Sequence, residues 1–354
     1  MKPPFRSSTL KSALKRVLAP ILYHLGYYHA TLRALRERAL VVMYHRVTDQ
    51  TLPARRRDDP VDRGINVLHF EAQIRYLRER MTPLPLDELV DRMRRSKPLP
   101  ARAIAVTFDD GYEDTYTVAS PVLKRYSVPA TVFVVAGFLD CADIFWWEKV
   151  PELLRITRHS SLDMLHLRAL SPAGDRLPRR FPLSSPRKRA RAAAELIGFM
   201  KDLPSAVLSE TLCALQDQLD VTTDAIDGSR HRIMNPVQLQ ALATDGIAVG
   251  AHTLTHPNLR TISHQEDLIH EIRSSKRILE DITQRPVTGF AYPYGFPKHY
   301  TQAARQAVIE AGFLFACTAR PGVLTRKDDS YEIPRVSAPS TPLPMFLWQL
   351  AKHV

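Results

Sequence analysis

Two adjacent carboxylates, Asp109 and Asp110, follow an apolar segment that runs from Ala101 to Val106. We predict that this segment is a buried strand, because Gly111 and a helix-like stretch then turn the chain away. Loops at the carboxyl ends of strands carry the chemistry in α/β folds. Neighbouring side chains of an extended chain point to opposite sides, so one aspartate could bind a cation while the other accepts a proton. A solvated Asp-Asp-Gly turn is the alternative.

A second apolar segment, residues 247–251, leads directly into His252 and His256. A spacing of four residues brings both imidazoles to one side of a helical turn, which suits a divalent ion. Asp110 could supply a third ligand and leave one position open for water. In a chain with 13 histidines such a pair is more often accidental, but together with the paired aspartates it indicates a metal site.

A third stretch, Gly289 to Gly295, is a glycine-flanked loop that contains Tyr292-Pro293-Tyr294. Stiffened by its proline, such a loop can hold a backbone N–H in a fixed direction, which is the usual device for stabilising a developing oxyanion. A plain structural turn is the alternative for this stretch.

The ordered motifs Thr-Phe-Asp-Asp-Gly, His-Thr-x-x-His and Tyr-Pro-Tyr-Gly resemble those of the polysaccharide deacetylase family, also called carbohydrate esterase family four. The resemblance covers roughly residues 40–140 and 233–339. It implies an α/β fold, a distorted (β/α) barrel of about seven parallel strands, with one divalent ion. It also implies metal ligands at Asp110, His252 and His256, the general base at Asp109, and an oxyanion-stabilising N–H at Tyr294. Zinc is the expected metal, with cobalt, nickel, manganese or iron as alternatives.

The sequence departs from the family pattern at two places. Many members carry an arginine two residues before the proline of the third motif, where it braces the base, and this chain has Ala291 there. Many also end with a Leu-x-His that supplies the general acid, but residues 333–337 contain no histidine. Residues 41–47 are similar to the Tyr-His segment of biofilm-type poly-N-acetylglucosamine deacetylases, whose motif order is permuted, and this implies His45 as the acid. Arg335 could replace the missing arginine, although we expect it to lie on the surface.

The composition of the 354 residues, 45% hydrophobic and 24% charged, is typical of a soluble globular protein with a sizeable core. A formal net charge of +12 favours an anionic partner such as nucleic acid, anionic lipid or an acidic glycan. No nucleic-acid module accompanies the charge, so we expect no nucleic-acid partner. Cys141, Cys213 and Cys317 are isolated and odd in number, which fits a reducing compartment better than a disulfide framework.

We predict three parts of the chain. Residues 1–39 form a basic arm with an amphipathic helix, residues 40–339 form the barrel with a helical insertion at about 140–232, and residues 340–354 form a C-terminal helix or tail. The insertion begins with an aromatic cluster, Phe145-Trp146-Trp147, that could stack on a sugar or clamp the insertion. Its basic cluster at 187–191 is either solvated or holds a phosphate.

Several boundaries near the site follow from turn and cap signals. Asn235-Pro236 predicts a helix start, and residues 299–311 predict a helix that ends at Gly312. Residues 49–63 predict a polar loop over the site. These elements should position the histidine and tyrosine motifs at the ends of their strands.

In the N-terminal arm, Lys11, Lys15 and Arg16 alternate with apolar residues, and tyrosines follow. The apolar run is too short and too polar to span a bilayer, and it lacks the pattern of a secretory signal. Residues 1–37 could lie in the headgroup layer of an anionic membrane, or the helix could pack against the catalytic domain. We therefore expect a cytoplasmic protein, peripheral on the inner face of the membrane in the first case.

The resemblance predicts metal-assisted hydrolysis of an N-acyl group, expected to be N-acetyl, on an amino sugar of a poly- or oligosaccharide. The ion would polarise the acyl carbonyl, Asp109 would take a proton from water, the Tyr294 N–H would hold the oxyanion, and His45 would protonate the leaving amine. One alternative is a deformylase or deacetylase of a lipid-linked sugar precursor at the membrane surface. The other is an inactive glycan-binding homologue, prompted by the two departures from the family pattern.

Overall fold

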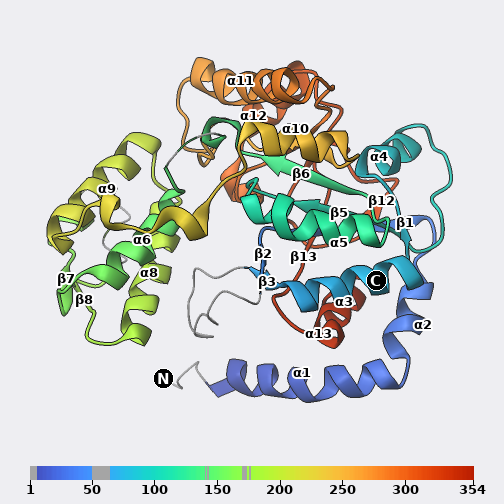
Figure 1. The fold of residues 1–354 in the computed structure, drawn as a ribbon, viewed down its shortest axis with the longest axis horizontal. Helices are drawn as coiled ribbons and strands as arrows, with labels where there is room; N and C mark the ends of the chain where they lie inside the picture. Colours follow the sequence, from blue (N-terminus) through green and yellow to red (C-terminus); the bar gives the residue numbers. More distant parts are fainter. Residues whose placement is uncertain (1–5, 50–63, 140, 142, 170–173, 175–176) are drawn as a thin grey trace.

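A curled sheet of parallel strands forms the centre of the protein in the computed structural model, which describes residues 6–49, 64–139, 141, 143–169, 174 and 177–354 (Figure 1). Six parallel strands lie side by side in the spatial order β11-β10-β9-β6-β5-β1. Their bounds are β1 (Arg38–Tyr44), β5 (Ala103–Phe108), β6 (Ala130–Val134), β9 (Ala248–Ala251), β10 (Gly289–Ala291) and β11 (Phe315–Cys317). Every residue of β5 and β6 is buried, which explains their continuous apolar sequences.

The segment 333–337 closes the sheet into a barrel. On one side, the Ile333 N–H donates a hydrogen bond to the Ala316 carbonyl at 2.9 Å. On the other side, β13 (Val336–Ser337) pairs in parallel with β1 through Val42. With this segment as a seventh parallel strand, the predicted distorted barrel is confirmed. Short strands β4 (Thr82–Pro83) and β12 (Leu324–Thr325) extend the sheet beside β5 and β1.

Side chains along β1 and β5 point alternately to the two faces of the sheet and so belong to two packed layers. Leu40, Val42, Ile104 and Val106 belong to the main core, beneath the surrounding helices. The intervening small residues, Ala39, Val41, Ala103 and Ala105, face the barrel interior together with Ile333. This parity continues past the strand ends, and it directs His45 and Asp109 toward the mouth of the barrel.

Seven helices of the described chain cover the barrel. They are α3 (Val67–Arg80), α4 (Leu86–Arg94), α5 (Ser120–Arg125), α10 (Pro236–Thr244), α11 (Gln265–Thr283), α12 (Gln302–Glu310) and α13 (Leu343–Ala351). The predicted helix start at Asn235 is confirmed, because its side chain accepts a hydrogen bond from the Gln238 N–H at 2.9 Å. The predicted start at His299 was wrong. Thr301 caps α12, and residues 297–299 form the short 3-10 helix η6 (Pro297–His299).

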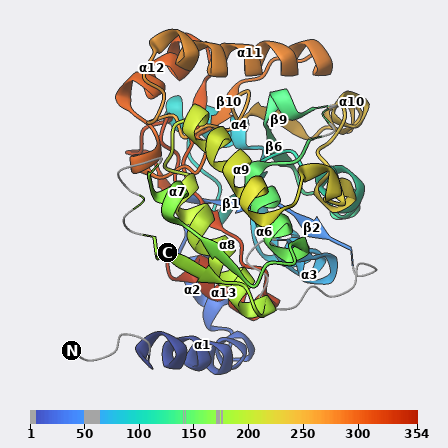
Figure 2. The same cartoon turned by 90° about the vertical axis from the view of Figure 1, so that its left-hand side faces the viewer.

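The insertion forms a lobe beside the barrel, at the left of Figure 1 and toward the viewer in Figure 2. Its helices are α6 (Trp146–Ile156), α7 (Leu165–Ala169), α8 (Pro186–Met200) and α9 (Ser205–Leu219), and β7 (Ser161–Asp163) pairs with β8 (Arg180–Pro182). The lobe has its own hydrophobic core, distinct from that of the barrel. The arrow of β6 points toward it, so the carboxyl ends of the parallel strands face the insertion (Figure 1).

The N-terminal helices, α1 (Arg6–His24) and α2 (Tyr27–Arg33), lie along one side of the barrel, where α1 packs against α13 (Figure 1). Ala19 is buried and Leu22 packs against the main core, so one side of α1 is anchored as one of our two alternatives predicts. Among the described residues, no helix combines the length and apolar character needed to cross a bilayer. The predicted loop over the site lies outside the described residues except for Asp49.

Candidate active site

One pocket of about 590 Å³ collects the predicted site residues at the mouth of the barrel. Each follows the carboxyl end of a strand or lies in the loop after it, where the sequence places them. All six line the pocket: His45, Asp109, Asp110, His252, His256 and Tyr294. The motifs that are far apart in the sequence therefore meet, as the parallel strand order requires.

Asp110, His252 and His256 form a donor set that fits a small divalent ion. The Asp110 Oδ1 atom lies 3.6 Å from the His252 Nε2 atom and 3.7 Å from the His256 Nε2 atom. These distances are too long for hydrogen bonds. Two ligands of a tetrahedral zinc ion are about 3.3 Å apart, given bonds of about 2.0 to 2.1 Å. All three ligand atoms lie within 4.8 Å of one another, so the group can converge on one ion.

Both histidines are held as neutral ligands. The His252 Nδ1 atom lies 2.7 Å from the Ala291 carbonyl oxygen, so Nδ1 carries the hydrogen and Nε2 presents its lone pair. Burial lowers the pKa of His252, and burial together with the neighbouring His252 lowers the pKa of His256 well below its ordinary value. Both rings are therefore neutral at neutral pH, and each can present one unprotonated nitrogen to a metal ion.

Strained backbone is concentrated at this site. Asp110, Thr253, His256 and Tyr294 all have positive φ, between 59° and 74°. They are four of the ten non-glycine residues with positive φ in the described chain. Such conformations cost roughly 1 kcal/mol or more each and persist where surrounding contacts hold them. One such contact is the hydrogen bond from the His256 N–H to the Thr253 Oγ1 atom at 3.0 Å.

Arg335 is buried, so the predicted surface position was wrong. It is 1% exposed, and its guanidinium binds both oxygens of Asp109 at 2.6 and 2.7 Å. The signal was available in the strand, because Arg335 lies two residues after Ile333 and therefore also faces the barrel interior. Burial alone would raise the pKa of Asp109, but Arg335 outweighs it and lowers that pKa to about 2. Arg335 thus braces Asp109 as an ionised carboxylate. It takes the place of the arginine that many family members carry where this chain has Ala291.

The aromatic cluster of the insertion contacts His256, one of the three candidate metal ligands. Trp147 stacks on Phe145 with ring centroids 4.3 Å apart, and its ring centroid lies 4.5 Å from that of His256. The Trp147 indole N–H donates a hydrogen bond to the Tyr112 hydroxyl at 3.2 Å. Trp146 and Trp147 also line the pocket, so the cluster both clamps the insertion and forms part of the site wall.

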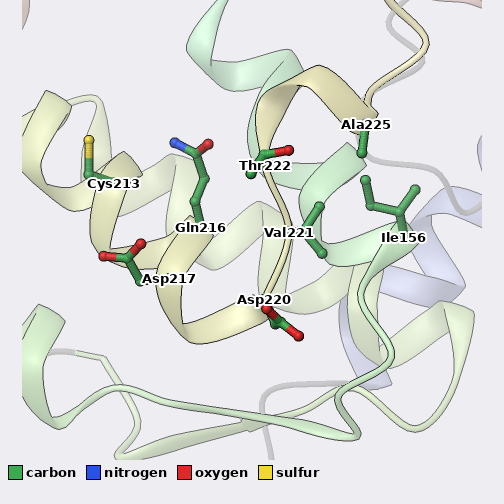
Figure 3. Close-up of a pocket in the computed structure, with 8 residues that line it drawn as sticks. All are labelled: Ile156, Cys213, Gln216, Asp217, Asp220, Val221, Thr222 and Ala225. Atoms are coloured by element: carbon green, nitrogen blue, oxygen red, sulfur yellow. The ribbon is translucent and has the colours of Figure 1, made fainter.

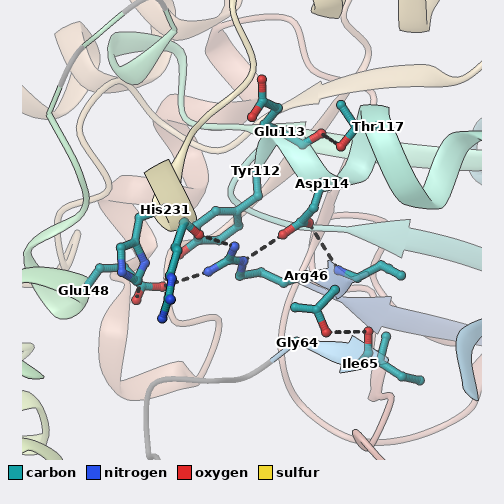
Figure 4. A network of polar contacts seen from close by, with 12 residues as sticks. Arg46, Gly64, Ile65, Tyr112, Glu113, Asp114, Thr117, Glu148 and His231 are labelled. Atoms are coloured by element: carbon teal, nitrogen blue, oxygen red, sulfur yellow. Dashed lines mark hydrogen bonds and ion pairs between the residues drawn. The ribbon is translucent and has the colours of Figure 1, made fainter. Parts of the chain in front are cut away.

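A buried polar network joins this clamp to the barrel (Figure 4). The Arg46 Nε atom donates to Asp114 at 2.8 Å, and the Tyr112 hydroxyl donates to Glu148 at 2.9 Å. The His231 Nδ1 atom lies 3.0 Å from the second oxygen of Glu148. Because buried charges are costly unless paired, these contacts fix the insertion against the residues that follow β1 and β5.

A second cavity of comparable volume, about 650 Å³, lies within the insertion, beside α9 (Figure 3). Cys213, Gln216 and Asp217 line it, together with apolar residues. It contains no residue of the three motifs. We therefore place the candidate active site in the smaller pocket at the barrel mouth.

Replacing Arg335 by methionine should lower the free energy of unfolding at pH 7 by about 3 to 5 kcal/mol, because Asp109 would remain buried without its counter-charge. The pKa of Asp109 is lowered in the folded state, so the ion pair contributes stability above the ordinary value of 3.8 and loses it as the pH falls toward 2. Denaturant unfolding should thus show a smaller difference between the variant and the wild type at acidic pH.

A matched control is Arg320→Met, which removes a surface ion pair with Asp328 at 3.3 Å. That variant should lower the free energy of unfolding by less than about 1 kcal/mol. Equal stability losses in both variants would contradict a special role for the buried pair.

Comparisons with known proteins agree with this arrangement. The family model described as Polysaccharide deacetylase matches residues 96–159 and 202–316, about half of the chain. YxkH of Bacillus subtilis, named as a candidate polysaccharide deacetylase, is 20% identical over 269 residues, which are 75% of this chain and 63% of that protein. The poly-β-1,6-N-acetyl-D-glucosamine N-deacetylase of Staphylococcus aureus is 38% identical over 75 residues, which are 21% of this chain and 26% of that protein. The alignments therefore span less than two thirds of either relative.

Two solved structures show the same fold. The Streptococcus pyogenes deacetylase PplD in complex with acetate has a TM-score of 0.56 at 16% identity, and the match covers 88% of this chain and 97% of that chain. IcaB from Ammonifex degensii has a TM-score of 0.55 at 19% identity, with coverage of 90% and 97%.

Proposed function

Because this chain belongs to the polysaccharide deacetylase family, we propose that it is a metal-dependent hydrolase that removes an N-acyl group, expected to be acetyl, from an amino sugar of a poly- or oligosaccharide. The single observation that carries the proposal is the convergence of the Asp110, His252 and His256 donor set with the Arg335-braced Asp109 in one pocket. An intact donor set beside an ionised base also argues against an inactive glycan-binding homologue.

The chain's own residues would perform the proton transfers. A divalent ion at the donor set supplies Lewis acidity toward the acyl carbonyl and lowers the pKa of water; we propose zinc, with cobalt, nickel, manganese or iron as alternatives. Asp109 takes one proton from the attacking water, and Arg335 keeps both carboxylate oxygens oriented for that transfer. The Tyr294 N–H donates to the oxygen on which negative charge develops.

Cleavage of the carbon–nitrogen bond then requires a proton on the leaving amine, and we assign that proton to His45. The side chain lines the pocket at the end of β1, and a positive charge on it would lower the pKa of Asp109. The acyl group leaves as a carboxylate and the sugar keeps a free amine.

His45→Ala should lower turnover while leaving metal content and folding unchanged, because its proposed work is to protonate the amine. An ionised Asp109 and a protonated His45 are needed together, so the wild-type pH–rate profile should be bell-shaped. The variant should lose the alkaline limb, whereas His270→Ala, at an exposed position on α11, should keep it. A variant that melts at a lower temperature but keeps the alkaline limb would make His45 structural, and His299 would be the next candidate.

The proposed function is tested by acetate release from a panel of N-acetylated substrates. The panel contains poly-β-1,6-N-acetylglucosamine, chitin oligosaccharides and a lipid-linked N-acetylamino sugar, each with and without added zinc. Metal-dependent acetate release from at least one member is the expected result. Glycan binding without release from any member, by protein that carries the ion, would favour the non-catalytic alternative.

The lipid-linked substrate is favoured by one observation, an exposed apolar strip that runs along α1 to Leu25, the residue after its end. Leu14, Val17, Ile21 and Leu25 recur at helical spacing and are between 49% and 75% exposed. Lys15 and Arg16 are exposed beside them. Apolar side chains flanked by positive charge are typical of helices that lie in the headgroup layer of an anionic membrane.

We propose on this basis that residues 1–39 are a membrane-facing arm, residues 40–339 the catalytic unit with its insertion at about 140–232, and residues 340–354 a C-terminal segment. The proposed location is cytoplasmic and peripheral on the inner face of the membrane. The membrane-facing arm is tested by the binding of α1 to lipid vesicles.

The double variant Val17→Ser/Leu25→Ser should weaken sedimentation with phosphatidylglycerol-containing vesicles by roughly tenfold or more, because it removes two side chains that would otherwise enter the apolar layer. Leu165→Ser is the matched control, since Leu165 is as exposed as Leu25 but lies in the insertion. Unchanged vesicle binding in the double variant would contradict the membrane-facing arm.

A further inference from the structure

One face of α8 forms a wall of the active-site pocket. Ala194, Ile197, Gly198 and Lys201 follow the spacing of a single helical face and line that pocket. The opposite face, with Leu196 among its residues, is buried in the core of the insertion. The helix is therefore held by one side and presents the other to whatever enters the pocket.

This wall lies in the part of the chain that the family model does not match. The matched residues end at 159 and resume at 202, and α8 falls between them. The metal donor set and Asp109 lie within the matched parts. The pocket thus combines the donor set and Asp109, which lie in the matched parts, with a wall from the unmatched part, and such a wall is where a preference for one substrate can arise.

Hydrogen bonds at both ends fix the wall in place. Near its start, the Arg189 guanidinium donates to the Thr157 carbonyl at 3.0 Å and so joins α8 to the end of α6. At its end, the Asn258 side-chain amide donates to the Lys201 carbonyl at 3.1 Å. Asn258 is buried and lies two residues after His256, so Lys201 is tied to the metal-ligand loop.

Two lysines and a buried histidine meet beside this wall. Lys201, Lys298 and His299 all line the pocket, and Arg260 holds the η6 loop by donating to the Lys298 carbonyl at 2.9 Å. Burial lowers the pKa of His299 to about 4, and the positive charges of Lys298 and Lys201 contribute to that shift. Both ammonium groups therefore act on the same ring.

His299 is positioned to donate a hydrogen bond to a ligand. It is 2% exposed, and within the described chain no hydrogen bond of ordinary geometry reaches either ring nitrogen, although the Tyr294 backbone lies close enough to raise the pKa of the ring. The nearest carboxylate is that of Asp202, whose Oδ1 atom lies 3.7 Å from the His299 Nε2 atom. Asp202 is half exposed and also lies 3.9 Å from the Lys298 ammonium, so it offsets one of the two lysines and leaves a net positive charge.

We propose that Lys201, Lys298 and His299, here called the α8 subsite, bind an anionic oxygen group, phosphate or carboxylate, that the amino-sugar substrate carries. The proposal rests on the proposed function and names its substrate class. Ammonium groups supply charge-assisted hydrogen bonds to such a group, and the buried imidazole gains an acceptor for its N–H.

Gly198 gives this ligand room. A Cβ atom at Gly198 would meet no atom within 4 Å, so packing does not require a glycine. Glycine destabilises a helix interior relative to alanine, but here it widens the pocket beside Lys201. A small residue at this point of the wall fits a ligand that passes close to α8.

The test is calorimetric binding of three sugars to metal-loaded protein in the Asp109→Asn background, where the sugars should not be consumed. The probes are N-acetylglucosamine 1-phosphate, N-acetylmuramic acid and uncharged di-N-acetylchitobiose. Lys201→Ala and Lys298→Ala should each raise the Kd of the preferred charged sugar by roughly fivefold to tenfold and leave the Kd of chitobiose unchanged. Lys188→Ala, an exposed lysine of α8 outside the pocket, should change none of them.

The two charged probes separate the sources of the anion, because the tighter one identifies phosphate or carboxylate as the group recognised. The proposal would be overturned if the protein with both lysines intact bound charged and uncharged sugars with equal affinity. It would also be overturned if a lysine variant weakened the binding of all three sugars equally. Lysine-dependent binding of a charged sugar in this background, together with no acetate release from any substrate by the metal-loaded wild-type protein, would support the α8 subsite and refute the proposed hydrolysis.

Discussion

Replacing His252 by alanine should remove the bound metal ion and acetate release together. The proposed ion has three protein ligands, so the loss of one removes a large share of its binding free energy. Divalent zinc sites at neutral pH are worth on the order of 10 kcal/mol, and one ligand of three accounts for about 3 kcal/mol, or at least a 100-fold loss of affinity. Metal content after dialysis and acetate release measure the two effects on the same sample.

Asp110→Ala and His256→Ala should behave like His252→Ala, because the three ligand atoms converge within 4.8 Å. His270→Ala, outside the pocket, is the control for the loss of a histidine as such. Circular dichroism should show folded protein in every case, since the barrel core does not include the donor set. A ligand variant that keeps full activity would remove that residue from the donor set.

Asp109→Asn should keep the metal ion and lower turnover by roughly 10² to 10⁴, which is the usual contribution of a positioned general base. The amide has nearly the same shape as the carboxylate but is not a base. The variant should also be less stable, because Arg335 would remain buried without its counter-charge. Turnover, metal content and unfolding therefore have to be measured together, and a loss of metal binding would make Asp109 a ligand.

The double variant Asp109→Asn/Arg335→Met separates catalysis from stability. Removing both charges should recover much of the stability that either single variant loses, because no uncompensated charge stays buried. Activity should remain as low as in Asp109→Asn, since the base is still absent. Recovery of activity along with stability would mean that the single variants fail through folding alone.

The sequence was sufficient to predict the donor set because its signals are local. Asp110, His252 and Tyr294 each lie just beyond a short apolar strand, and parallel strands bring such positions to one edge of a sheet. The helix start at Asn235 follows from a similar local pattern, whereas the barrel was predicted from the resemblance to the family. Local signals also explain the failure at His299, where the cap at Thr301 moves the helix start three residues further.

Arg335 and α8 could not be placed so easily, because their positions depend on contacts between distant parts of the chain. Arg335 reaches Asp109 only after residues 333–337 close the barrel between β11 and β1. The face of α8 meets the pocket because buried ion pairs around Glu148 and the Asn258 hydrogen bond orient the insertion. No periodicity in the insertion encodes that orientation.

The most direct test of the metal-dependent active site is a titration of metal-stripped protein with zinc, during which acetate release from an N-acetylated substrate of the panel is recorded. Activity should rise in proportion to added zinc and reach a plateau at one ion per chain, and His252→Ala should stay inactive at the same concentrations. Full activity before any metal is added, or a plateau that His252→Ala reaches equally, would contradict the assignment of Asp110, His252 and His256 as the site of the reaction.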